Sequence, residues 1–371
     1  MVRRGRWFGT AGIGALVGVM LVVAGCSSGS SSTAGPSSSA PAGSVSLTTN
    51  GAGAPPAASG SAAGVSGQTI TVYSGQHEQT TQALVADFEK RTGVSVKLKS
   101  DDEASLAGQV LQEGSASPAD VFFAENPPAL TTLQENNLLT TVDASTLSQV
   151  PTKASSPGQD WVGVSARAVA FAANNSVPAS SLPASVMDLA GPAWKGKLGL
   201  APSETDFSPL ITAVIKAKGA DAAKSWLQAL MANGKVFADN ETLISAIDKG
   251  EVQGGLVDHY YWYRLRDEVG ASKVASGLHY FPAGDPGSLV DVSGAAVLKS
   301  SSHAAAAQAF LAYLVSAPAQ QIIATSHSYE YPLRPGVSSS ADLPPMGAIV
   351  SPAELGDGKP ALALLQDVGL L

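Results

Sequence analysis

The chain has 371 residues, of which 22 are Lys or Arg and 30 are Asp or Glu, so its formal net charge at pH 7 is −8. This acidic balance, and the lack of a basic stretch with interleaved aromatic residues, excludes a typical nucleic-acid-binding protein. The chain is longer than one hydrophobic core usually supports, so two lobes are expected.

The first 25 residues have the pattern of an export signal. Arg3, Arg4 and Arg6 form a basic start, and the apolar stretch 13–23 is short for a membrane-spanning helix. It ends in VAGC, which resembles the lipobox of a bacterial lipoprotein and would make Cys26 the lipidated first residue of the mature chain. The alternative is a chance cysteine after an apolar segment. We expect export and a lipid anchor at the outer face of the cytoplasmic membrane.

The segment that follows has an unusual composition. From position 27 to 67 it contains no charged and no aromatic residue, and Ser, Gly, Ala, Pro and Thr dominate it. Such a segment buries too little apolar surface to offset the entropy cost of an ordered structure. With the anchor residue included, 26–67 is predicted to be a disordered tether, and the folded body is expected to begin at position 68.

The body opens with alternating strand and helix patterns. Strands are expected at 69–74, 94–100 and 120–123, and helices at 78–92, 104–114 and from Pro127 onward. Gly93 and Gly114 follow two of these helices, as expected of C-terminal caps, and Pro127 suits a first helical turn. This order predicts a parallel sheet covered by helices.

The same alternation returns further along the chain. Strands are expected at 197–202, 235–238, 252–257 and 289–298, and helices at 206–218, 220–233, 241–249, from Tyr260 onward and at 304–315. Two α/β lobes fit this repetition better than one large sheet. We place the first lobe at 68–170, with 291–328 returning to it, and the second at 171–290, with 329–371 returning to it.

Polar residues gather where the expected strands end. In the first lobe they are 74–77, 100–102 and 125–126, and in the second lobe 203–205, 240 and 258–261. An open α/β sheet binds ligands beyond the carboxyl ends of its strands. A ligand cleft between the two lobes is therefore expected.

The most unusual of these segments is DHYYWYRL, at 258–265, where three of the chain's eight tyrosines stand within four positions. On a strand, Tyr260 and Tyr261 would point to opposite faces. If Asp258 caps a helix that starts near Tyr260, both phenols lie in its first turn and can reach one point before the helix end. Structural packing is expected for their neighbours His259, Trp262 and Tyr263.

His77, Glu125, Tyr260 and Tyr261 together offer an imidazole, a carboxylate and two phenols. Without thiolates, this set suits a hard, highly charged cation. A free tyrosine has a pKa of about 10, so a phenolate at neutral pH needs a strong positive charge beside it. Other interpretations stay open here: His77 as a hydrogen-bonded loop residue, Glu125 as the partner of a helix N-terminus, and the tyrosines as a core edge or a stacking platform.

The chain resembles the periplasmic ferric-ion-binding proteins, which are the substrate-binding components of iron(III) ABC importers. Four stretches carry the resemblance in this order and spacing: YSGQHEQ (73–79), SPADVFFAEN (117–126), GEVQGGLVDHYYWYRL (250–265) and DVSGAAVL (291–298). The resemblance extends from about Thr69 to Leu333. It implies that Fe(III) is bound by His77, Glu125, Tyr260 and Tyr261.

The resemblance also implies a fold and a function. The fold would be the type II periplasmic-binding-protein fold, α/β in class, whose two lobes close on the ligand about crossover segments near 168–171 and 289–292. The protein would be a monomeric binding component that delivers Fe(III) to a membrane permease and its ATPase. It would not be an enzyme, and no Gly-x-Ser-x-Gly or His-Glu-x-x-His motif indicates a hydrolase.

A synergistic anion, phosphate or carbonate, often completes the iron shell in that family, at a helix N-terminus. The matching positions here are Asn126, Ser203, Glu204, Thr205 and Asn240. Asp258, however, stands where the family usually has an asparagine, and Glu204 is unusual in its loop. Two carboxylates would repel phosphate, so we expect weak or absent phosphate dependence, with Glu204 or Asp258 replacing the anion.

One alternative keeps the fold and changes the ligand. A polyamine, thiamine or sugar phosphate would use the aromatic residues for stacking or cation–π contact and the acids as counter-ions. Ferric tyrosinate is coloured and such an organic complex is not, so visible absorbance distinguishes the two ligands.

Overall fold

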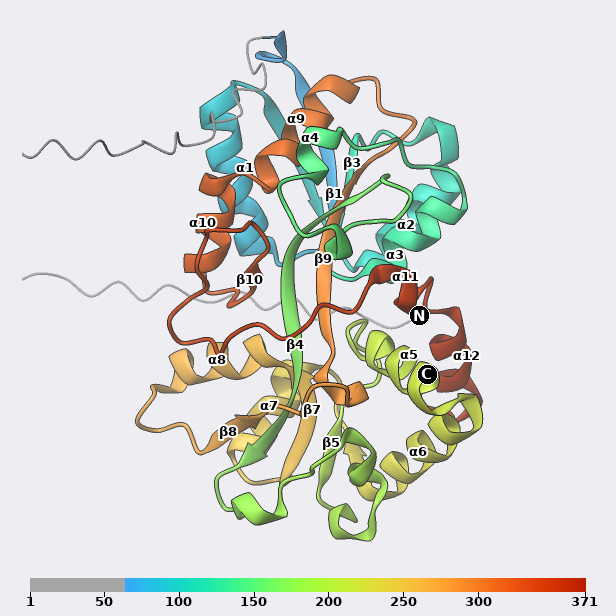
Figure 1. Ribbon diagram of the computed structural model, residues 1–371, viewed down its shortest axis with the longest axis vertical. Coiled ribbons are helices and arrows are strands. Elements are labelled where there is room, and N and C mark those ends of the chain that lie inside the picture. Colours follow the sequence, from blue (N-terminus) through green and yellow to red (C-terminus); the bar gives the residue numbers. More distant parts are fainter. Residues whose placement is uncertain (1–63) are drawn as a thin grey trace, which may run out of the picture. The chain divides into compact units, whose positions relative to one another are not determined.

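The computed structural model describes residues 64–371 (Figure 1). The predicted signal peptide, the lipidation site Cys26 and most of the predicted tether lie outside the described residues. The folded body includes residues before the predicted start at position 68, because Val65 is only 5% exposed and packs into the hydrophobic core. Among the described residues, no helix combines the length and the apolar character needed to cross a membrane.

The first lobe is built on the strands predicted near the start of the body. β1 (Thr69–Ser74) pairs in parallel with both β2 (Ser95–Ser100) and β3 (Val121–Ala124). The helices that alternate with these strands are α1 (Glu78–Thr92), α2 (Glu103–Glu113) and α3 (Pro127–Glu135). Gly93 ends α1 in the left-handed region, with a φ of 71°, as predicted for a C-terminal cap. The predicted strand and helix order is confirmed here.

Two strands link the first lobe to the second (Figure 1). β4 (Val162–Asn174) pairs with β9 (Val290–Val297) up to Ala168 and with β7 (Gly254–Asp258) from Val169 onward, both times antiparallel. β3 also pairs antiparallel with β9, so the sheet is mixed and not parallel as predicted. The local alternation of strand and helix does not indicate which distant strands pair antiparallel, so the sequence did not predict these pairings.

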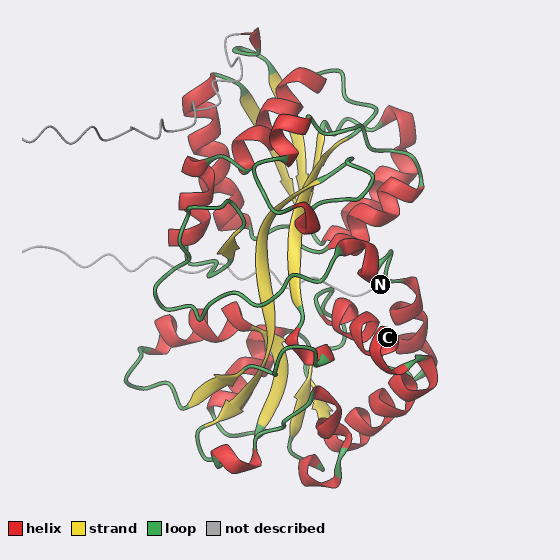
Figure 2. Cartoon of the chain, in the orientation of Figure 1, coloured by secondary structure: helices red, strands yellow, loops and turns green. Residues whose placement is uncertain are grey.

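The second lobe repeats the parallel arrangement on the other part of β4. β7 and β6 (Gly234–Val236) pair in parallel with β5 (Leu198–Leu200), and β8 (Ser276–His279) pairs antiparallel with β4. Figure 2 shows helices on the outside of these strands. They are α5 (Phe207–Lys218), α6 (Ala220–Asn233), α7 (Asn240–Asp248) and α8 (His259–Val269). Both lobes lie on one hydrogen-bonded path of strands, in the order β2-β1-β3-β9-β4-β7-β5-β6.

The remaining α-helices and strands are a short helix before β4 and the elements that follow β9. They are α4 (Ala144–Leu147), α9 (Ala304–Leu314), α10 (Ala317–Thr325), β10 (Tyr331–Pro332), α11 (Pro352–Leu355) and α12 (Lys359–Asp367). β10 pairs with β4 at Ser165 and Ala166, in the first lobe, whereas α12 packs on α5 of the second. The segment 329–371, predicted to return to the second lobe, thus starts on the first. The predicted lobe limits stay a prediction.

The predicted crossover segments coincide with the junction of the lobes. β4 changes partners between Ala168 and Val169, and the Val169 N–H donates to the Leu289 carbonyl at 3.0 Å, directly before β9 begins. These positions lie within or beside the ranges 168–171 and 289–292. The hinge motion itself stays a prediction.

Candidate metal-binding site

His77 and Glu125 lie beyond the carboxyl ends of two neighbouring strands. His77 directly precedes α1, in the loop after β1, and Glu125 directly follows β3. Because β1 and β3 are paired in parallel, their carboxyl ends meet at one edge of the sheet. His77 Nε2 is 3.2 Å from Glu125 Oε1. Strand pairing in the first lobe thus brings two of the predicted ligands together.

Tyr260 and Tyr261 enter the same place from the second lobe. α8 begins at His259, so both tyrosines lie in its first turn, as predicted. The fully buried Tyr260 donates its hydroxyl to Glu125 Oε1 at 2.8 Å. Its ring centroid lies 4.7 Å from that of His77 and 4.4 Å from that of Tyr261. Three of the four predicted ligands are in direct contact, and the fourth packs beside them.

The His77 and Glu125 side chains form an ion pair. Burial lowers the pKa of His77, but the charge of Glu125 and the hydrogen bond to it outweigh burial and raise this pKa to about 9. Burial raises the pKa of Glu125, but the charge of His77, the hydrogen bonds from His77 and Tyr260 and the charge of Arg167 together outweigh burial and hold this pKa at about 2. At neutral pH the pair is therefore an imidazolium and a carboxylate.

The two phenols are in the opposite state. Burial, followed by the charge of Glu125, raises the pKa of Tyr260 well above its ordinary value. Burial, followed by the charge of Asp206, does the same to the pKa of Tyr261. Both phenols therefore keep their protons at neutral pH, which agrees with Tyr260 acting as a hydrogen-bond donor to Glu125. Ionising them requires a strong positive charge in the site.

A buried arginine lies behind the site. Arg167, in β4, has no exposed surface, and its Nη2 donates to Asn126 Oδ1 at 2.6 Å. Two buried carboxylates face the same guanidinium, with Asp258 3.5 Å from Nε and Glu330 3.9 Å from Nη1. Burial lowers the pKa of Arg167, but the surrounding carboxylates, Asp291 first, outweigh burial and raise it. The guanidinium thus carries the positive charge that balances this group of acids.

Asp258 lies directly before α8, as expected, but its side chain does not cap the helix. It is the N-cap residue of α8, but its side chain makes no capping hydrogen bond. Its carboxylate faces Arg167 instead. A buried guanidinium without counter-ions is far more costly than an uncapped helix end. This explains why the Asp258 carboxylate faces Arg167 and does not cap α8.

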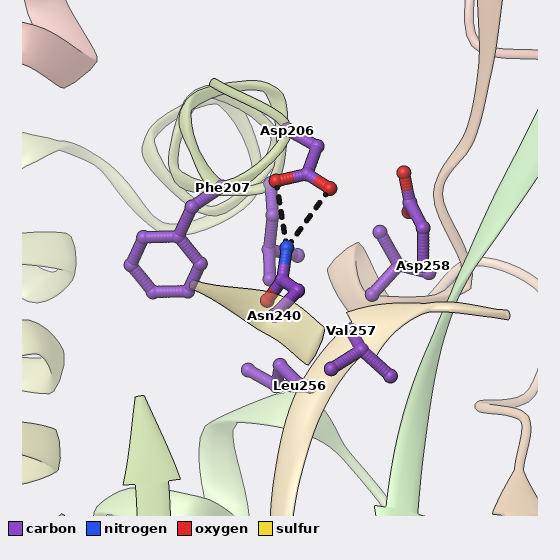
Figure 3. Close-up of a pocket in the computed structure, with 8 residues that line it drawn as sticks. Asp206, Phe207, Asn240, Leu256, Val257 and Asp258 are labelled. Atoms are coloured by element: carbon purple, nitrogen blue, oxygen red, sulfur yellow. Dashed lines mark hydrogen bonds between the residues drawn. The ribbon is translucent and has the colours of Figure 1, made fainter. Parts of the chain in front are cut away.

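The other predicted anion-binding residues have partners within the protein or line a cavity. Ser203 Oγ donates to the Ala238 carbonyl at 3.1 Å. Asn240 Nδ2 donates to both carboxylate oxygens of Asp206, at 3.2 and 3.1 Å (Figure 3). The backbone N–H and the Nδ2 of Asn126 donate to Glu103, at 2.8 and 2.7 Å. Glu204 and Thr205 line a cavity of about 560 Å³ between α2, α3 and α12.

Five charged residues of this region were not predicted from the sequence: Glu103, Arg167, Asp206, Asp291 and Glu330. Arg167 gave one usable signal, because it is the only charged residue in the apolar run VGVSARAVAFAAN. Glu330 accepts hydrogen bonds from Gln76 Nε2 at 3.1 Å and Ser165 Oγ at 3.0 Å, and its carboxylate lies 3.7 Å from His77 Nδ1. These contacts join distant parts of the chain.

The neighbours of the tyrosine pair have structural partners, as predicted. His259 Nδ1 accepts the Ala168 N–H at 3.1 Å, so its Nε2 donates to the Tyr329 carbonyl at 2.7 Å. Burial lowers the pKa of His259 to about 4, which keeps the ring neutral. Trp262 Nε1 donates to Ser276 Oγ, and the Tyr263 hydroxyl donates to the Asp342 carbonyl at 2.8 Å.

The phenols of Tyr260 and Tyr261 add oxygen donors to the two conventional metal ligands at this position. Across residues 64–371, no three His, Cys, Asp or Glu side chains converge as a metal-binding group. His77 and Glu125 supply only two such ligands, and Tyr260 and Tyr261 are the additional oxygen donors beside them.

Comparison with known proteins identifies the family. Residues 70–327 match the family described as bacterial extracellular solute-binding protein. The chain is 35% identical over 317 residues to the Fe(3+)-binding periplasmic protein of Serratia marcescens, covering 84% of this chain and 94% of that protein. It is 39% identical over 311 residues to the major ferric iron-binding protein of Neisseria meningitidis serogroup B, covering 81% and 93%. The chain belongs to the periplasmic ferric-ion-binding protein family.

Solved structures of family members have the same fold. Iron-bound HitA from Pseudomonas aeruginosa is 40% identical, with a TM-score of 0.78 over 81% of this chain and 99% of that one. IdiA (FutA) of Trichodesmium, in complex with iron and citrate ligands, is 31% identical, with a TM-score of 0.72 and the same two coverages. The predicted family and α/β periplasmic-binding-protein fold are confirmed. This member of the ferric-ion-binding family is an extracytoplasmic binding protein and not an enzyme.

Proposed function

We propose that the protein captures Fe(III) between its two lobes and delivers it to the permease of an ABC importer. The contact of His77 and Tyr260 with the same oxygen of Glu125, at 3.2 and 2.8 Å, carries this proposal. Two ligand atoms at about 2.0–2.1 Å from one octahedral ion lie about 2.9 Å apart. The spacing of these three side chains, which come from both lobes, therefore suits a shared ion.

The charges of the four ligands suit a trivalent ion. Two phenolates, from Tyr260 and Tyr261, and the carboxylate of Glu125 would balance the three positive charges of Fe(III), with His77 as a neutral ligand. Fe(III) supplies the positive charge that phenol ionisation requires, and the N-terminus of α8 favours the negative form of both side chains. The ion would thus replace the protons that now join these groups.

We also propose that iron binding depends weakly or not at all on phosphate or carbonate. Ser203 and Asn240, which would bind such an anion, already donate to Ala238 and Asp206. Carboxylates surround the predicted anion-binding position, and they would repel a bound phosphate or carbonate. Two residues were predicted to replace the anion. Asp258 forms an ion pair with Arg167, whereas Glu204 lines the neighbouring cavity. The same acids disfavour a sugar phosphate as the ligand.

The location and partners complete the proposal. The N-terminal segment directs export, Cys26 carries the lipid anchor, and the uncharged segment after it tethers a monomeric body near the membrane. Partners of the body are the membrane permease and its ATPase.

Visible spectroscopy tests the proposed function. Adding Fe(III) to the purified protein should produce a tyrosinate-to-iron charge-transfer band that saturates at one iron per protein. Tyr260→Phe and Tyr261→Phe should each weaken and shift this band. Tyr263→Phe is the matched control, because the Tyr263 hydroxyl donates to the Asp342 carbonyl and should leave the band unchanged. A wild-type protein without the band would overturn the iron assignment and favour an organic ligand.

A further inference from the structure

The C-terminal segment lies across the junction of the two lobes, away from the candidate metal ligands. At its start, the Val350 N–H donates to the Val290 carbonyl at 3.1 Å, and Ile349 forms a parallel bridge with the same residue of β9. Further along, α11 packs on both α3 of the first lobe and α5 of the second (Figure 1, red). We call residues 349–371 the C-terminal strap.

The strap is fixed to the second lobe by its apolar residues. Leu355, Ala361 and Leu365 are 3%, 0% and 2% exposed and belong to the hydrophobic cluster built around α5 and α6. At the far end of α12, Asp367 forms an ion pair with Lys224 of α6. Buried apolar contacts of this kind are costly to break, so the strap must move together with the second lobe.

One residue of the strap lies between the two lobes at very close range. A Cβ atom on Gly358 would be 3.2 Å from Pro128 Cβ of α3 and 3.3 Å from Ser208 Oγ of α5. Both distances are shorter than the 3.5–4.0 Å at which carbon atoms pack best. Gly358 also has a φ of 72°, which glycine adopts readily. Glycine therefore lets the strap touch both lobes where they approach each other.

The other contacts with the first lobe are limited to the same part of the strap. Lys359 Nζ lies 3.7 Å from Glu135 Oε2, at the end of α3. Beyond Lys359, a cavity of about 560 Å³ separates α12 from α2, and Leu111 and Leu362 are among its lining residues. The strap thus holds the first lobe only through α11, Gly358 and Lys359, and few contacts must break when the lobes separate.

We propose that the C-terminal strap is a latch that stabilises the closed arrangement of the lobes and slows the release of captured Fe(III). This inference rests on the proposed function for the identity of the cargo. The candidate ligands come from both lobes, so release requires the lobes to separate. Because the strap moves with the second lobe, this separation must also break its contacts with α3. The strap then controls the release rate without touching the ion.

Charge reversal tests the ion pair between the strap and the first lobe. Glu135→Lys places a positive charge opposite Lys359, and both side chains are exposed, so the fold should persist. Iron release to excess EDTA, followed by loss of the charge-transfer band, should be about two- to fivefold faster, the range for an exposed pair. The difference should fade at high salt. Adding Lys359→Glu should restore the wild-type rate.

Asp367→Lys is the matched control for Glu135→Lys. It makes the same change of charge and also breaks an exposed ion pair of the strap, but its partner, Lys224, lies in the second lobe. Release should therefore keep the wild-type rate. A strap that only completes the core of the second lobe would make the two variants alike.

A pair of glycine substitutions tests the close contact. Gly358 and Gly356 both have positive φ, 72° and 61°, so alanine strains the backbone at either position. Only at Gly358 does the added methyl group meet Pro128 and Ser208, since nothing lies within 4 Å of a Cβ on Gly356. Gly358→Ala should release iron at least about fivefold faster, as expected of an overpacked contact. Gly356→Ala should keep the wild-type rate.

Small-angle X-ray scattering of the iron-free protein measures closure without the ion. Glu135→Lys and Gly358→Ala should each have a larger radius of gyration than their controls, Asp367→Lys and Gly356→Ala. Equal release rates within both pairs of variants would overturn the latch. If the wild-type protein shows no charge-transfer band, the proposed function fails, and scattering alone then decides the latch: equal radii would overturn it, and larger radii would support it.

Discussion

The two lobes hold their candidate ligands in different states. In the first lobe, His77 and Glu125 lie at the ends of paired strands and are already ionised against each other. In the second lobe, Tyr260 and Tyr261 lie in the first turn of a helix and keep their protons. The first lobe thus presents a prepared ion pair, whereas the two phenols of the second lobe become negative only when a cation arrives.

Because the two lobes differ in this way, one site can be stable in the free protein and still bind a trivalent ion. Three unpaired negative groups, a carboxylate and two phenolates, would repel one another strongly in a buried place. Protonated phenols avoid that repulsion, and the Tyr260 hydroxyl uses its proton to bond Glu125 across the lobes. The groups that would bind iron therefore also hold the lobes together.

The largest expected effect concerns the charge shared by both lobes. Arg167 faces Asp258 of the second lobe and Glu330 of the first, so Arg167→Met leaves buried carboxylates without their counter-ion. We expect a loss of about 3–5 kcal/mol in the free energy of unfolding, measured by urea denaturation. Arg91→Met, at an exposed ion pair with Asp87, is the control and should cost less than about 1 kcal/mol. Equal losses of unfolding free energy in Arg167→Met and Arg91→Met would show that the Arg167 charge does not stabilise the contact between the lobes.

The next effect tests the prepared ion pair of the first lobe. Glu125→Gln keeps the size of the side chain and removes its charge, so iron affinity should fall at least about 100-fold. The main cause of the raised His77 pKa would also be removed, so that pKa should fall from about 9 towards or below its ordinary value. NMR titration of the imidazole checks the second point. A His77 pKa that stays near 9 would contradict the ion pair.

Proton release tests the neutral phenols of the second lobe. At pH 7, Tyr260, Tyr261 and His77, whose pKa is about 9, all hold protons that a bound ion would displace. Binding should therefore release about three protons and weaken as the pH falls. Calorimetry in buffers of different ionisation enthalpy measures this number. Tyr261→Phe should release about one proton fewer, and an unchanged number would exclude Tyr261 as a ligand.

The smallest effect separates the packing tyrosine from the pair. Tyr263→Phe removes the hydrogen bond to the Asp342 carbonyl, so the free energy of unfolding should fall by about 0.5–1.5 kcal/mol. Iron affinity should not change, because the Tyr263 hydroxyl bonds away from the site. Thermal unfolding and iron titration of the same sample check both statements. A loss of affinity would extend the candidate site beyond Tyr260 and Tyr261.

The elements and the first ligands could be predicted because their signals are local. Strand alternation, the glycine after α1 and the proline at the start of α3 mark the elements within a few residues. Parallel strands of one lobe end at the same edge, which explains why His77 and Glu125 could be placed together. A helix that starts at the end of β7 likewise determines that Tyr260 and Tyr261 share a first turn.

The partners of β4 and of the buried carboxylates depend on contacts between distant parts of the chain. The run 162–174 is almost entirely buried, so it lacks the alternation that marks a half-exposed strand, and its pairing with both β9 and β7 appears only in the fold. Asp258 faces Arg167, and the Asp206 carboxylate lies near the Tyr260 hydroxyl. Both contacts depend on which charges the two lobes bring together. Local pattern determines the elements and where each ligand lies on them, whereas the balance of buried charge, which only long-range contacts define, determines what each carboxylate binds.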